Sequence, residues 1–191
     1  MSLISRRLVV CVGACAVWGI TLASPAAARA QDVMSKESVA ELKTAFLADI
    51  EVMRGKFVGL AEAFPQDKYA WRPMEGVRSV SEVLMLIASE GYNFVPGAFG
   101  GKPALAREEA GKLPAISDKA QVIEHLNKGF AHAKAQLEAI DPGSLTGRRT
   151  VMGQPRSAAQ IALVVGGDMH EHLGQLIAYA RSNRIVPPWS K

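Results

Sequence analysis

Cysteine is nearly absent from this 191-residue chain, and its two cysteines, Cys11 and Cys15, both lie near the start. Residues 31–191 therefore contain no thiol, which excludes disulfides, thiolate metal sites and a cysteine nucleophile from that part of the chain. A strong charge of one sign is also missing. Three of the 22 basic residues and none of the 18 acidic residues lie in residues 1–30, which leaves residues 31–191 with one net positive charge. We therefore expect no nucleic-acid partner.

A hydrophobic run long enough to span a membrane is missing as well. The longest such run covers residues 8–23, which is shorter than the roughly 20 residues that a spanning helix needs. Two arginines precede it, and residues 28–30 place small side chains at the −3 and −1 positions. This pattern predicts a secretory signal peptide over residues 1–30, with an uncleaved anchor as the alternative. The protein is then periplasmic or extracellular, with no membrane contact after cleavage.

Apolar residues recur at intervals of three and four in four segments, which predicts four amphipathic helices. These helices are expected at residues 39–64, 80–94, 119–140 and 158–183. Capping-box patterns begin the first, second and fourth at Ser38, Ser79 and Ser157, and Ser117 or Asp118 is expected to cap the third.

Sustained alternation of period two is absent, so we predict an all-α fold over residues 31–191. The connection at residues 95–118 is long and rich in glycine and proline. It predicts a four-helix bundle with a long crossover between helices two and three, so that helix three runs parallel to helix two. The apolar tail at residues 185–189 is expected to pack on the bundle.

Two polar residues, Asp168 and His172, interrupt the apolar stripe of the last predicted helix. They are four residues apart, so they share a face one turn apart, and we expect that face to look inward. A carboxylate and a neutral imidazole suit zinc, nickel, iron or manganese. The second helix offers Glu82 and Glu90 as a third ligand. Because Glu82 is expected in its capping box, Glu90 is the better candidate.

Other interpretations of these residues stay open. Asp168 and His172 could form a buried hydrogen-bonded pair, or an acid/base pair without metal. Glu90 could instead face water at the rim of its helix. We expect His125, His132 and His170 at the surface.

Three blocks of the sequence resemble the DinB-like superfamily. They are Tyr69-x-Trp71-x-Pro73 followed by residues 77–83, the last-helix residues 168–181, and the tail at residues 186–190. The resemblance implies a four-helix bundle with a long second crossover, commonly dimeric. It also implies a divalent metal held by one histidine from helix two and two histidines four apart on the last helix. In this chain Leu86 stands at the helix-two position, Asp168 stands at the first last-helix position, and His172 matches.

Together with the predicted signal peptide, the resemblance implies an exported, divalent-metal-dependent hydrolase or transferase with an incomplete metal site. Zinc or nickel is the expected cofactor, a small molecule the expected substrate, and a homodimer the possible assembly. Two alternatives follow from the missing histidine: a non-catalytic helical bundle that binds a small apolar ligand, and a structural dimer without a ligand.

Overall fold

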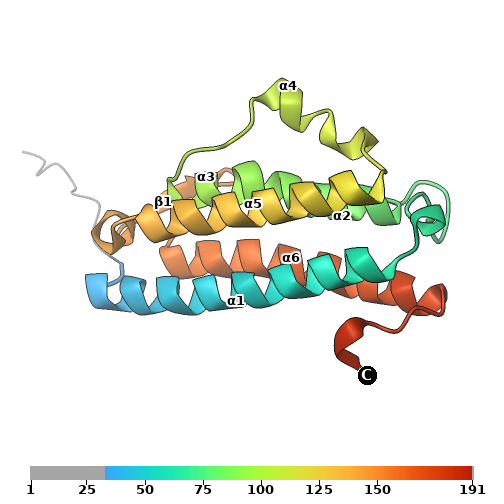
Figure 1. The fold of residues 1–191 in the computed structure, drawn as a ribbon. Coiled ribbons are helices and arrows are strands. Elements are labelled where there is room, and N and C mark those ends of the chain that lie inside the picture. Colours follow the sequence, from blue (N-terminus) through green and yellow to red (C-terminus); the bar gives the residue numbers. More distant parts are fainter. Residues whose placement is uncertain (1–32, 191) are drawn as a thin grey trace, which may run out of the picture.

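The computed structural model describes residues 33–190, which consist mainly of helices (Figure 1). This confirms the all-α prediction, whereas the predicted signal peptide lies outside the described residues. In chain order the elements are α1 (Lys36–Ala63), η1 (Gln66–Lys68), α2 (Val80–Ser89), η2 (Glu90–Phe94), α3 (Val95–Phe99), α4 (Arg107–Ala110), η3 (Leu113–Ala115), α5 (Lys119–Ala139), η4 (Pro142–Leu145), β1 (Arg149–Val151), β2 (Gln154–Arg156), α6 (Ala158–Ser182) and η5 (Pro188–Ser190).

Four long helical segments lie side by side: α1, α6, α5 and the continuous segment formed by α2, η2 and α3 (Figure 1). Helices α1 and α6 run in one direction, and α2 and α5 run in the other, because the connection that carries α4 returns the chain to the start of α5. All four segments contribute to one buried apolar core, whose largest fully buried side chains are Tyr69, Phe57, Phe64, Phe130, Ile50, Met53, Leu60, Leu84, Met85, Ile87, Leu126 and Ile161.

Side-chain caps begin the long helices, as the sequence predicts for three of them. Complete capping boxes open α2 at Ser79 and α6 at Ser157, and Asp118 caps α5 by accepting from the Gln121 backbone N–H. The prediction for the first helix is wrong by one turn. Ser35 caps it by accepting from the backbone N–H of Ser38, so the helix already begins at Lys36.

The second helical segment differs from the single helix predicted at residues 80–94. Its α-helical hydrogen bonding changes to a π-helical turn at Glu90–Phe94, and the helix then continues to Phe99. It ends at Gly100, whose φ of 86° is in the left-handed region. The turn packs closely on α5, since a Cβ on Gly91 would lie 2.6 Å from the backbone carbon of Gly129. Side-chain periodicity alone did not predict this change of pitch.

A short antiparallel hairpin, β1–β2, precedes α6 and was not predicted. Each strand has three residues, which is too short for an alternating pattern to stand out. Met152 and Gly153 form the turn with φ values of 50° and 73°.

The C-terminal segment packs against α1, as predicted. Pro187 is buried, and Pro188 lies over Gly59 with its Cγ 3.5 Å from where a Cβ would be. The Lys56 ammonium lies 5.7 Å from the centre of the Trp189 ring. None of the helices within residues 33–190 is both long and apolar enough to cross a membrane.

Candidate metal centre

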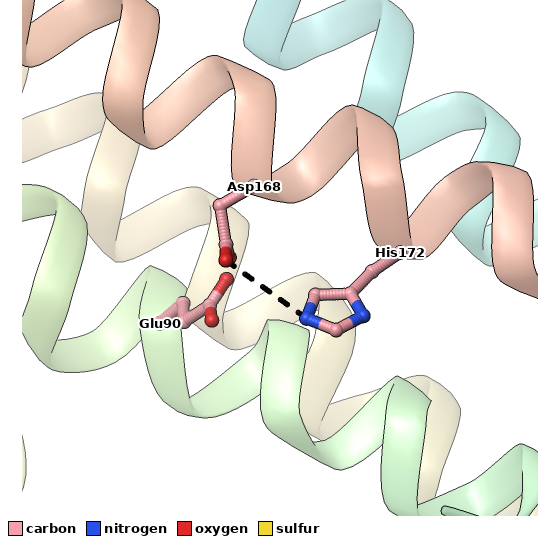
Figure 2. A group of neighbouring side chains, drawn as sticks. All are labelled: Glu90, Asp168 and His172. Atoms are coloured by element: carbon pink, nitrogen blue, oxygen red, sulfur yellow. Dashed lines mark ion pairs between the residues drawn. The ribbon is translucent and has the colours of Figure 1, made fainter.

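Glu90, Asp168 and His172 point toward one another between two helical segments (Figure 2). Glu90 lies where α2 passes into the π-helical turn, and the other two residues lie one turn apart on α6. One potential ligand atom from each residue lies within 4.8 Å of the others. The structure therefore brings together the three residues that the sequence selected, and this group could hold a metal ion.

The inward stripe predicted for the last helix is buried at Val165 and Leu176 but is displaced by one position at its two polar members. The core receives Met169 and Leu173 in place of Asp168 and His172. His172 is 15% exposed and Asp168 is 40% exposed, so both lie at the edge of the core.

Two carboxylate oxygens in the group are buried without a hydrogen-bond partner in the described part of the chain, Glu90 Oε2 and Asp168 Oδ2. The distance from His172 Nε2 to Asp168 Oδ1 is 4.0 Å, which is too long for a hydrogen bond. Buried acceptors without donors are rare in native proteins because each loses its hydration. Either a proton on Glu90 or a cation between these atoms would satisfy them, so the residues present fit a divalent metal.

The other face of His172 is held by a chain of hydrogen bonds that sets its tautomer. Its Nδ1 lies 2.9 Å from Gln175 Oε1, the Gln175 amide donates to the Tyr179 hydroxyl at 2.8 Å, and that hydroxyl donates to the backbone carbonyl of Arg78 at 3.0 Å. A carbonyl can only accept, so the chain has one direction and Nδ1 carries the proton. The lone pair of Nε2 is then left facing Asp168 and Glu90, the arrangement typical of histidine ligands.

Burial, the negative charge of Asp168 and a hydrogen bond that protonated Glu90 donates to Asp168 together raise the pKa of Glu90 to about 8, against an opposing effect of Arg78. Without a cation, the group therefore holds a proton near neutral pH. Two carboxylates and an imidazole form a three-ligand set that suits zinc or a neighbouring transition metal and leaves a coordination position open.

The remaining histidines lie outside this group. His170 is half-exposed and pairs with Asp49 at 3.1 Å. The other two are half-buried at the edge of α5: His125 lies 3.2 Å from the Tyr92 hydroxyl, and His132 lies 2.8 Å from the Lys102 carbonyl. The predicted capping role of Glu82 is confirmed, because its carboxylate accepts from the Ser79 backbone N–H at 2.7 Å.

Sequence reasoning missed Gln175 and Tyr179 as supports of His172. Their spacing of three and seven residues from His172 places them on the same helix face, which is the one signal that could have indicated them. No sequence signal indicates that the Arg78 carbonyl accepts from Tyr179, since this bond depends on how the loop before α2 packs on α6.

No curated protein matches this chain. The sequence model of the DinB superfamily matches residues 49–176, a range that contains all three residues of the candidate metal centre. The chain belongs to the DinB superfamily.

Proposed function

We propose that this protein is an exported hydrolase or transferase that depends on a divalent metal, built as a four-helix bundle of the DinB type. Glu90, Asp168 and His172 are its proposed ligands, and zinc or nickel its proposed metal. Export rests on the signal-peptide pattern in residues 1–30. A homodimer and a small-molecule substrate remain predictions from the family resemblance.

The observation that carries the proposal is the convergence of unsatisfied acceptors. Glu90 Oε2 and Asp168 Oδ2 find no donor among residues 33–190, and the tautomer of His172 directs a lone pair at the same point. A bound divalent cation supplies Lewis-acid chemistry. Gln175 orients the imidazole, and the partial exposure of Asp168 gives a substrate access to the group.

Leu86 stands one turn before Glu90 on α2, so Glu90 would replace the helix-two histidine of the family from the next turn. In this proposal the site differs from the three-histidine site of the family in its ligands, and Glu90 is the third ligand. The acid/base alternative without metal has less support, because Asp168 and His172 are too far apart to share a hydrogen bond.

Binding of a small apolar ligand in the core has little support from the enclosed space there. The apolar cavity between α1 and α5, near Phe46 and Leu137, has a volume of about 10 Å³. This is room for about one water molecule. The open cleft that includes Leu86 on α2 has a volume of about 390 Å³ and is the better place for a small molecule.

Metal content tests the proposal. The protein is purified without a polyhistidine tag, analysed by inductively coupled plasma mass spectrometry, stripped with a chelator and titrated with zinc in a calorimeter. We expect one zinc per chain, lost in Asp168→Ala and retained in the control Asp49→Ala, which removes an aspartate paired with a different histidine of α6. Zinc-free protein that binds none on titration, or equal loss in both variants, would contradict the proposal.

A further inference from the structure

An open cleft of about 390 Å³ lies between the loop before α2 and the face of α2 that carries Leu86. Its walls come from the loop before α2, from one face of α2 and from a residue of the long crossover. The three proposed ligands do not line it, but Leu86 does, and Leu86 shares a helix face with Glu90 one turn further on. A molecule in this cleft would therefore contact the loop before α2 and could extend along this face toward Glu90.

Two of the three charged residues that line the cleft neutralise each other. Arg72 pairs with Glu82 at 3.2 Å and donates to the Val77 carbonyl at 3.0 Å. The third, Arg78, makes no side-chain hydrogen bond or ion pair with any residue in 33–190, yet its charge lies close enough to lower the pKa of Glu90. Arg78 therefore gives the cleft one uncommitted positive charge.

The backbone that carries Arg78 is tied to the candidate metal centre. Its carbonyl accepts from the Tyr179 hydroxyl at 3.0 Å, at the end of the chain of hydrogen bonds that begins on His172. The edge of the Trp71 ring packs on the same tyrosine, with ring centres 5.3 Å apart. These contacts hold the start of the Arg78 side chain at a fixed place relative to the proposed ligands, while its guanidinium stays exposed.

The rest of the cleft wall suits hydrocarbon. Met85 and Leu86 line it from α2, with Leu86 half-buried. With a divalent cation bound, the charges of Glu90 and Asp168 would cancel the cation, and Arg78 would leave the site with one positive charge. A guanidinium binds a carboxylate through two parallel hydrogen bonds, which gives both charge and orientation.

We infer that the site accepts a small organic carboxylate, whose acidic group pairs with Arg78 and whose hydrocarbon part lies against Leu86. As a statement about the substrate, this rests on the proposed metal-dependent function. As a statement about binding, it rests on the cleft alone and can be tested without metal.

Calorimetric titration of the metal-free protein with benzoate and benzamide tests the inference. The two probes have nearly the same shape and differ in charge. We expect benzoate to bind at least ten times more tightly than benzamide. Arg78→Gln should lower benzoate affinity at least tenfold, Arg78→Lys should retain part of it, and Arg107→Gln on the distant α4 should leave it unchanged.

Equal affinity for the two probes in the unmodified protein would overturn the inference, and so would full benzoate affinity in a folded Arg78→Gln variant. The probe comparison needs no substitution, so it decides the matter even if a variant fails to fold. Zinc titration of the same samples separates the two proposals. Zinc binding without preference for benzoate would overturn the carboxylate site alone, whereas Arg78-dependent benzoate binding without zinc binding would overturn the metal function alone.

Discussion

Helix α6 carries two histidines two residues apart, each near an aspartate, and the two pairs differ in what they leave unsatisfied. His170 Nε2 lies 3.1 and 3.2 Å from the two carboxylate oxygens of Asp49 on α1. His172 Nε2 lies 4.0 Å from Asp168 Oδ1, and the carboxyl of Glu90 lies beside them with one buried oxygen that has no hydrogen-bond partner in the described part of the chain. The two histidine–aspartate pairs therefore differ in whether their polar atoms are satisfied. The first is a complete contact between helices, and the second is a set of acceptors that needs a cation or a proton.

Removing each histidine in turn should give the largest difference in zinc affinity between the two pairs. His172→Ala is expected to weaken zinc binding by on the order of 100-fold or more, because it deletes an oriented ligand. His170→Ala, which removes an exposed partner of Asp49, should leave zinc binding within about twofold and the unfolding free energy within about 1 kcal/mol. Calorimetric zinc titration and thermal unfolding measure both. Equal zinc affinities in the two variants would remove the distinction.

A ligand exchange on α2 should sharpen the account of the third ligand. Glu90→Ala is expected to weaken zinc binding strongly. Adding Leu86→His to that variant should raise its zinc affinity by at least about tenfold, since the two positions share a helix face. The control is Leu163→His in the same background, at an exposed position on α6 outside the three-residue group. If both histidines restore binding alike, Leu86 has no special relation to the site.

Close helix packing beside Glu90 should be sensitive to one methyl group. Gly91→Ala is expected to lower the unfolding free energy by about 1–3 kcal/mol, because the new Cβ would meet the backbone of Gly129. Gly167→Ala is the matched control on α6. Its Cβ would meet nothing within 4 Å, so its better helix propensity should stabilise the protein by up to about 1 kcal/mol. Denaturant unfolding measures both changes, and two changes of the same sign would contradict the packing account.

The raised pKa of Glu90 predicts how the stability of the metal-free protein varies with pH. The folded state keeps this proton up to about pH 8, whereas the unfolded chain releases it near its ordinary value of 4.5. The contribution of this protonation to the free energy of unfolding is therefore fully present below pH 4.5 and is lost as pH rises to 8. The free energy of unfolding then falls by at most about 1.4 kcal/mol per pH unit. Asp168, His172 and Arg78 face the same group. In Glu90→Gln, the free energy of unfolding measured in urea should vary less with pH between 4.5 and 8. An unchanged slope in that variant would contradict the assignment.

The smallest expected effect concerns the residues that orient the two histidines. Gln175→Leu should weaken zinc binding by about tenfold, because His172 would lose the acceptor that fixes its tautomer. Asp49→Asn changes the equivalent partner of His170 and should leave zinc binding unchanged. If Gln175→Leu binds zinc normally, the hydrogen-bond chain to Arg78 has no role in preparing the ligand.

The sequence predicted the parts of this molecule that follow from local periodicity and capping. Four helical segments, the caps at Ser79 and Ser157 and the grouping of Asp168 with His172 all depend on spacings within one helix, which side-chain pattern expresses directly. The inward direction assigned to that pair was one position off. Met169 and Leu173 take the core instead, because the contact between helices decides which of two adjacent stripes is covered.

Features that depend on contacts between distant segments could not be predicted in this way. The π-helical turn at Glu90–Phe94 goes with the close approach of Gly91 to Gly129 on α5, and no pattern in α2 expresses that contact. The tie from Tyr179 to Arg78 likewise joins residues 101 positions apart. These long-range contacts turn two residues of α6 into a candidate centre with a third ligand and an adjacent cleft.

Anomalous diffraction at the zinc edge, from crystals of the zinc-loaded protein, tests the central claim most directly. The account predicts one strong peak between the side chains of Glu90, Asp168 and His172, and none at the complete pair of Asp49 and His170. Zinc at the Asp49–His170 pair, or crystals soaked to saturation with no peak at the three-residue group, would contradict it.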